Sequence, residues 1–136
     1  MRDSILNHEQ AQQDWQTIRD AIVKIYAQKA STLSYEELYR TCYYLVLYKH
    51  GEMLYENVKK TTVEMLQPIA QKLVESTDDE LLKEITSQWT MEKKVIRVIK
   101  EILLYMDKNF AKKARNLMNV QDMQTAQFKK HVVLKE

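Results

Sequence analysis

The side chains that most often carry chemistry are few in this sequence and lie far apart. His8, His50 and His131 have no cysteine or carboxylate at the spacing of a zinc or di-iron site. Cys42 is the only cysteine, and on a helix it falls on the same side as two leucines, which indicates a buried thiol rather than a nucleophile. There is no Gly-rich loop and no nucleophilic-serine motif. We therefore expect no metal, no cofactor, no small-molecule substrate and no enzymatic activity.

Aromatic side chains gather instead on one predicted helix, residues 35–50. At about 100° per residue, Leu38, Cys42 and Leu45 share the side that faces the core. The adjoining side carries two tyrosines, Tyr39 and Tyr43, together with Glu36, Arg40 and Leu47. Because Tyr and Arg are enriched at the energetic centres of protein interfaces, this side is a candidate binding surface. The composition equally permits a helix that is buried all round.

A second set of outward side chains is predicted on the last strongly patterned helix. Its inward side is defined by four apolar residues: Ile99, Leu103, Met106 and Phe110. Tyr105 and Lys108, three residues apart, project from the other side, where Tyr105 has no core to enter. One exposed tyrosine is ordinary, so the pattern alone does not separate a binding site from plain surface.

Helices must position these side chains, because turn residues are almost absent. The 136 residues include one Gly and one Pro, too few for a β-sandwich, a Rossmann fold or a phosphate-binding loop. Helical periodicity runs from Gln10 to Lys29, where the apolar residues Trp15, Ile18, Ile22, Ile25 and Tyr26 fall on one side of the helix. It continues over 35–50, from Glu52 and again from Leu82. We expect one all-α domain, a bundle of about five helices.

Local signals predict several helix boundaries. Capping boxes mark two helix starts, Ser34 with Glu37 and Thr77 with Glu80. Gly51 is expected to adopt the left-handed conformation that ends the helix before it. Pro68 should kink or break the next helix, and residues 78–112 form either one helix or two joined near Thr90.

The two ends of the chain are less strongly patterned than its middle. We divide the chain into an N-terminal extension, a helical bundle and a weakly helical tail: residues 1–9, 10–115 and 116–136. In the tail, Val120, Met123 and Phe128 are too sparse among polar residues to define a strong face. We expect a weak helix or a frayed end there.

Charge and hydropathy exclude further partners. Lys+Arg 21 against Asp+Glu 19 gives a net charge of +2, too small to predict a nucleic-acid partner, and the cluster of Lys112, Lys113 and Arg115 is typical of a solvated helix end. A membrane-spanning helix needs about 20 consecutive apolar residues, and no apolar run in this sequence approaches that length, so we expect no association with a membrane. The lone cysteine and the missing signal-peptide pattern favour the cytoplasm, the nucleus or both.

The segment SYEELYRTCYYLVLYKHGEMLY, residues 34–55, closely resembles the N-terminal helical domain of cullins. The resemblance is to the cullin-3 type, which assembles ubiquitin ligases with BTB-domain adaptors. It extends to DWQTIRDAI, to the QW pair at 88–89 and to LLYMDK at 103–108, and so covers Trp15 to Phe110. The polar tail from Ala111 onward matches poorly.

This resemblance implies a cullin repeat whose outward face binds a BTB fold. The family's adaptor-contact segments correspond here to Leu33, Tyr35, Glu36, Tyr39, Arg40, Tyr43, Tyr105 and Lys108. Tyr35 replaces a Phe of the family, and Lys108 replaces an Arg, so bidentate pairing is lost at that position. Both outward tyrosine surfaces belong to this set, which favours the interpretation as a binding surface. The family role is non-catalytic, since a cullin positions an adaptor-bound substrate near an enzyme recruited elsewhere.

Several alternatives remain open at this stage. The adaptor can be of the Skp1 or elongin type, which is related to BTB folds in shape. The chain is either a fragment of a scaffold or a short decoy protein that occupies BTB adaptors without delivering ubiquitin. A helical enzyme is a remote third possibility. In some proteins of the family, residues before the first helix pack into a groove beside the BTB fold, and the resemblance gives this role to residues 1–8, with Ile5 and Leu6 as apolar candidates.

Overall fold

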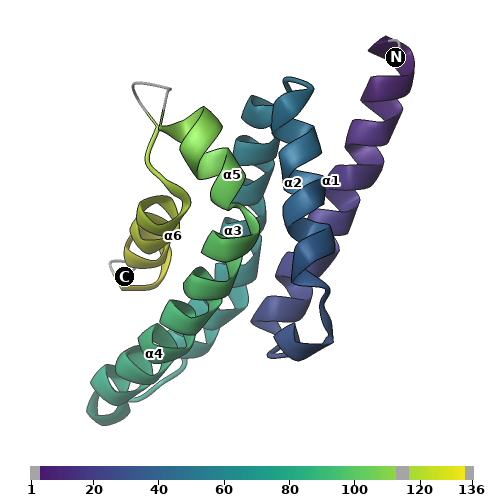
Figure 1. Ribbon diagram of the computed structural model, residues 1–136. Coiled ribbons are helices and arrows are strands. Elements are labelled where there is room, and N and C mark those ends of the chain that lie inside the picture. Colours follow the sequence, from purple (N-terminus) through teal and green to yellow (C-terminus); the bar gives the residue numbers. More distant parts are fainter. Residues whose placement is uncertain (1–3, 113–116, 134–136) are drawn as a thin grey trace.

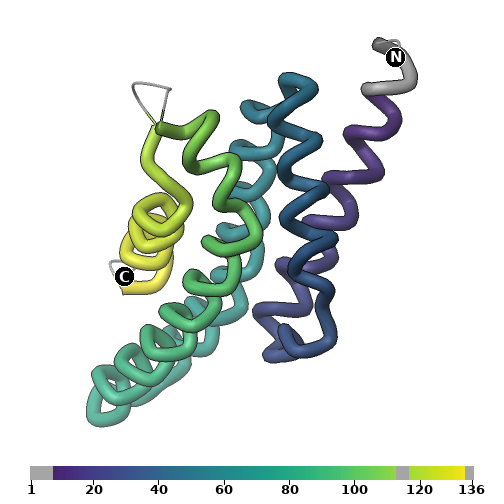
Figure 2. The backbone as a smooth tube through the Cα atoms, viewed as in Figure 1, coloured from purple at the N-terminus to yellow at the C-terminus, as the bar shows by residue number. Residues whose placement is uncertain are grey.

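The computed structural model describes the backbone of residues 4–112 and 117–133, with side chains from His8 onward (Figure 2). Within these ranges the protein is helical and contains no strand, so the all-α prediction is confirmed. Five helices have nine residues or more: α1 (Ser4–Tyr26), α2 (Tyr35–Leu47), α3 (Gly51–Val74), α4 (Asp78–Ile102) and α6 (Val120–Phe128). A single turn, α5 (Leu104–Met106), follows α4 after a bend at Leu103 and lies beside α2. The side chains of Ile5 and Leu6 and the residues Lys113 and Arg115 lie outside the described part.

The helices form two groups that share α3 and α4 (Figure 1). At one end of the molecule α2 lies between α1 and α5 and packs against both. At the other end α3 and α4 extend together as a long hairpin, and α6 packs against this pair. The helix α2 also contacts α3 and α4, so among the described residues only its side facing away from these helices lacks a covering helix.

Two apolar clusters fill the interior of these groups. The main cluster joins α1, α2, the first half of α3, the second half of α4 and the start of α6, with Ile18, Leu54 and Ile99 fully buried. The predicted core sides of α1 and α2 are confirmed, since Trp15, Ile22, Leu38 and Leu45 all belong to it. A smaller cluster at the far end of the hairpin consists of five buried residues: Leu66, Ala70, Leu73, Phe128 and Val132.

Buried polar side chains separate the two clusters. They are Thr61, Thr62, Glu92, Gln124 and Gln127. On α3 the threonines stand between Val58 of the main cluster and Leu66 of the small one, and Glu92 and Gln124 occupy equivalent places on α4 and α6. We call these five residues the polar layer.

Hydrogen bonds made by residues of the polar layer connect helices that are far apart in the sequence. The Tyr26 hydroxyl of α1 donates to Glu92 Oε2 at 2.8 Å, and Gln124 Nε2 donates to Thr62 Oγ1 at 3.3 Å. Burial raises the pKa of Glu92 to about 7, against the lowering effect of the Tyr26 hydrogen bond. Gln124 Oε1 is buried without a partner among the described residues.

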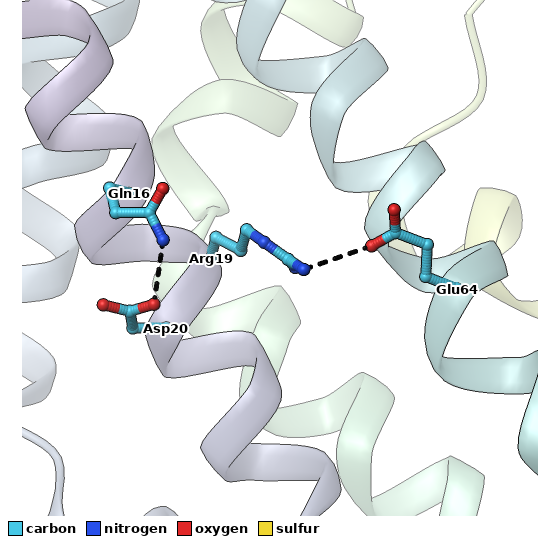
Figure 3. A network of polar contacts seen from close by, with 4 residues as sticks. All are labelled: Gln16, Arg19, Asp20 and Glu64. Carbon is cyan, nitrogen blue, oxygen red and sulfur yellow. Dashed lines mark hydrogen bonds and ion pairs between the residues drawn. The ribbon is translucent and has the colours of Figure 1, made fainter.

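An ion pair on the surface also joins α1 to α3. Arg19 Nη2 lies 3.4 Å from Glu64 Oε1, and on the same helix Gln16 donates to Asp20 at 3.0 Å (Figure 3). The side chains of Arg19 and Glu64 both remain partly exposed to solvent, so this ion pair adds little to the stability of the fold.

Several predicted boundaries require correction. The first helix begins at Ser4 rather than Gln10, because no Gly or Pro interrupts it. The helix α3 continues through Pro68 without a break, and α4 continues through Thr90 as one helix that ends at Ile102. Ser34 and Thr77 are the N-cap residues of α2 and α4, but neither side chain makes the predicted capping hydrogen bond.

The prediction for Gly51 is also wrong. The left-handed residue after α2 is Lys49, with φ of 71°, while Gly51 is the first residue of α3. The amide of His50 donates to the Leu45 carbonyl at 2.8 Å, which is the bond of a Schellman motif. Glycine is needed at 51 for space, because an added Cβ would lie 2.7 Å from the Phe110 ring.

The expectation of a weakly packed tail is wrong as well. Asn119 caps α6 by accepting a hydrogen bond from the Asp122 amide at 2.7 Å. Two further bonds fix the start of this helix: the Tyr55 hydroxyl donates to the Met118 carbonyl at 2.7 Å, and the Val120 amide donates to Asp107 Oδ1 at 2.8 Å. Because Phe128 and Val132 complete the small cluster, α6 is part of the core.

Candidate protein-interaction interface

The exposed side of α2 is rich in tyrosine. Tyr39, Tyr44 and Tyr48 are 38%, 43% and 44% exposed, while the opposite side of the helix is buried. The helix is therefore not buried all round, and the interpretation with an outward aromatic side is the correct one. The tyrosine rings on this side of α2 offer a large, rigid apolar area, and their hydroxyl groups are polar. Side chains of this kind are common at binding hot spots.

Tyr43 and Tyr105 bring the two predicted tyrosine surfaces together. Their rings meet edge to face with centroids 4.7 Å apart, and both side chains are half-buried. Tyr105 packs partly against the main cluster, so the expectation that it has no core to enter is wrong. The reason is that the chain turns at Leu103, which directs the α5 turn across the end of α2. Lys108 lies just beyond this turn and is exposed.

Sequence reasoning missed Tyr44 and Tyr48. The Tyr44 ring lies 5.6 Å from that of Tyr43 and stacks 6.4 Å from that of Tyr48. The four rings of Tyr105, Tyr43, Tyr44 and Tyr48 thus form a continuous row across α2. The spacing of four between Arg40, Tyr44 and Tyr48 was the available signal. We call Tyr39 together with this row the aromatic face.

The remaining predicted residues lie at the N-terminal end of α2. Leu33 is half-buried against the main cluster, and the Tyr35 hydroxyl donates to the Ala30 carbonyl at 3.0 Å. Glu36 and Arg40 form an ion pair four residues apart on α2, with 3.5 Å between Glu36 Oε2 and Arg40 Nη2. The Glu36 side chain is 88% exposed, so a partner reaches this pair without any rearrangement of the core.

The thiol of Cys42 lies beneath this face, within the main cluster. Burial raises its pKa to about 12, which keeps the thiol protonated at neutral pH and unsuited to nucleophilic attack. The placement agrees with its predicted role as a small apolar group.

Other kinds of site find little support in the described residues. Across 8–112 and 117–133, no three His, Cys, Asp or Glu side chains come close enough together to hold a metal ion. Among the described helices, none is long and apolar enough to cross a membrane. The aromatic face is consequently the strongest candidate for a functional site.

Comparison with known proteins gives a consistent result. Residues 15–136 match the family described as the cullin alpha solenoid domain. The match includes the tail, which corrects the expectation that similarity ends near Ala111. The chain is 41% identical over 118 residues to Cullin-3 of Dictyostelium discoideum, covering 87% of this chain and 15% of that protein. It is 35% identical over 106 residues to Cullin-3A of Arabidopsis thaliana, covering 78% of this chain and 14% of that protein.

Proposed function

This chain belongs to the cullin family, and we propose that it is a non-catalytic module of a ubiquitin ligase scaffold that binds a BTB-domain adaptor through the aromatic face. The chain spans only 15% of the length of the Dictyostelium relative, so the ligase role is proposed for the protein as a whole. The cytoplasm and nucleus, expected from the lone cysteine, are the compartments of this proposal.

The observation that carries the proposal is the exposure of tyrosines on a helix with a fully formed core behind it. Leu38, Cys42 and Leu45 satisfy the packing of α2 from within, so Tyr39 and Tyr44 are not required there. Exposing large aromatic rings to water is unfavourable unless a partner covers them in the assembled state. A second protein that buries this face gains the apolar area that the fold leaves uncovered.

The choice of a BTB adaptor is supported by the relatives, several of which are named Cullin-3. The resemblance of residues 34–55 to the cullin-3 type leads to the same class of partner. A Skp1- or elongin-type adaptor is the alternative, because the shared docking surface would be similar.

Calorimetric titration with a purified BTB adaptor domain tests the proposal. We expect the wild-type chain to bind, and Tyr39→Ala to weaken binding by about 2 kcal/mol, the scale of an interface hot spot. Leu82→Ala is the matched control, since Leu82 is 76% exposed at the far end of the hairpin and should leave affinity unchanged.

Tyr43→Ala extends the same test to the contact with Tyr105. We expect a loss of affinity similar to that of Tyr39→Ala, together with a loss of about 1 kcal/mol in stability from the ring pair. Thermal unfolding of each variant separates the two effects. Binding to a Skp1-type protein but not to a BTB domain would support the alternative adaptor, and a loss of stability with unchanged affinity would show that these tyrosines serve only the fold.

A further inference from the structure

A groove of about 390 Å³ lies between α1 and α2, on the side of α2 away from α5. Its floor includes Ala11 and Leu45, which are buried members of the main cluster. Tyr44 and Tyr48 of the aromatic face form part of its wall. The groove is therefore continuous with the proposed adaptor surface but is lined by different chemistry.

Two carboxylates give this groove a negative character. Asp14 of α1 and Glu37 of α2 both line it, and no cation among the described residues pairs with either one. Asp14 accepts one hydrogen bond, from Gln10 Nε2 at 2.9 Å through Oδ1, which leaves its second oxygen available. Two basic side chains, Arg40 and His50, also line the groove, but the Arg40 guanidinium is paired with Glu36 and His50 forms no ion pair with Asp14 or Glu37.

We propose that this groove receives an arginine side chain of the adaptor, between the carboxylates of Asp14 and Glu37 and the rings of Tyr44 and Tyr48. The inference rests on the proposed function, because it assigns a second contact to the same partner. It extends the docking surface from α2 to the N-terminal half of α1.

Arginine fits this combination of groups better than other side chains do. Its aliphatic stem can cover an apolar floor, its planar guanidinium stacks on aromatic rings, and its several donors match carboxylate oxygens. An acidic segment would be repelled by the two carboxylates, and a purely apolar one would leave them desolvated and unpaired. Tyr44 follows Tyr39 by five residues, about 7.5 Å along the helix axis and about 140° around it, so a partner seated on Tyr39 reaches Tyr44 across the exposed side of α2 that carries Arg40.

Charge-neutral variants test the inference in calorimetric titrations with the BTB adaptor domain. Asp14→Asn and Glu37→Gln are each expected to weaken binding about fivefold, and the double variant more than tenfold, with a reduced dependence on salt. Asp20→Asn is the matched control: Asp20 also lies on α1 and accepts a hydrogen bond from the glutamine four residues earlier, but it is outside the groove. Helicity by circular dichroism confirms that each variant is folded, and Glu37→Gln is the safer variant because Glu37 is exposed.

A scan of the adaptor's surface arginines to methionine identifies the occupant. One arginine should lose its effect on affinity when Asp14 is already Asn, whereas the others should act independently of it. If Tyr39→Ala weakens binding and neither acidic variant does, the groove is overturned while the proposed function stands. If the wild-type chain does not bind the adaptor, both are overturned, and a dimer in sedimentation that the acidic variants abolish would assign the groove to a second copy instead.

Discussion

The helices α2 and α6 differ in burial in the opposite way from what their apolar content indicates. The sequence of α2, YEELYRTCYYLVL, is dominated by apolar and aromatic residues, yet Tyr39, Tyr44 and Leu47 are exposed. The sequence of α6, VQDMQTAQF, is largely polar, yet Gln124 and Gln127 are buried beside its apolar residues. Apolar content alone therefore does not decide how much of a helix lies in the core.

Neighbouring helices decide it instead. The α2 helix contacts α1, α3, α4 and α5, and no helix of the described residues covers its remaining side, so its surplus aromatic side chains stay in solvent. The α6 helix lies across α3 and α4 at the level of the polar layer, where an amide side chain finds a hydroxyl partner in Thr62. Exposed apolar side chains that the core does not need indicate a binding partner. Buried polar side chains on a helix indicate that it packs where two parts of the fold meet.

The largest expected difference between the two helices is in stability. Phe128→Ala should lower the free energy of unfolding by about 3 to 5 kcal/mol, because it empties the centre of the small cluster, where its ring lies 5.2 Å from that of Trp89. Tyr39→Ala should change it by less than about 1 kcal/mol. Urea denaturation followed by circular dichroism measures both, and equal effects would remove the contrast between the helices.

Glu92 provides a pH-dependent test of the polar layer. Its pKa rises from 4.5 to about 7 on folding, so the folded state binds more protons over that interval. The contribution of Glu92 to the free energy of unfolding should therefore be greatest below about pH 4.5. It should fall as the pH rises to about 7, by on the order of 3 kcal/mol at most. Urea midpoints at pH 5 and pH 8 measure the loss.

Glu92→Gln should remove this pH dependence while keeping an acceptor for the Tyr26 hydroxyl. Glu84→Gln, a change on a half-buried residue of the same helix, is the control and should leave the slope intact. An unchanged slope in Glu92→Gln would mean that other carboxylates produce it.

A smaller and opposite effect is expected from the unpartnered amide on α6. Gln124→Met should raise the free energy of unfolding by about 1 to 2 kcal/mol, because it removes the buried Oε1 that lacks a partner. The Thr62 hydroxyl keeps its bond to the Val58 carbonyl at 2.9 Å. Thermal unfolding measures the gain in stability. Gln127→Met should gain less stability, because Gln127 has no buried side-chain atom without a hydrogen-bond partner. A loss of stability in Gln124→Met would indicate that water satisfies this amide.

The smallest effect is expected on the exposed side of α2. Glu36→Gln breaks the pair with Arg40 and should cost about 0.3 to 0.5 kcal/mol of stability at low salt, and almost nothing at high salt. Titration with the adaptor should show a loss of about 1 kcal/mol, since these exposed charges contribute less than buried tyrosine. A steep dependence of binding on ionic strength in the wild type would reverse this ranking.

Helix periodicity predicted the strongly patterned elements well. The core sides of α1 and α2 followed directly from regular spacing, as with Ile18, Ile22 and Leu45. It failed for α6 because two of the inward positions are occupied by glutamine, and no periodic pattern can tell a buried amide from an exposed one. The start at Asn119 with Asp122 was a readable capping signal that the polar composition obscured.

The arrangement of the aromatic face was predicted only in part, for a similar reason. Tyr39 and Tyr43 were identified because they fall beside the core residues of α2, but the contact between Tyr43 and Tyr105 depends on the turn at Leu103. The role of Gly51 was likewise hidden, since it is set by the Phe110 ring from a segment far along the chain. Contacts between distant segments leave no trace in local spacing.

The position of α6 also determines the order in which this chain can complete its fold during synthesis. Tyr55 bonds to Met118 and Thr62 to Gln124, across separations of 63 and 62 residues. On the ribosome, the hairpin of α3 and α4 emerges first and exposes Leu66, Ala70 and Leu73 until Phe128 and Val132 follow. The small cluster is therefore completed only after α6 has been synthesised, and its closure depends on contacts between segments far apart in the chain.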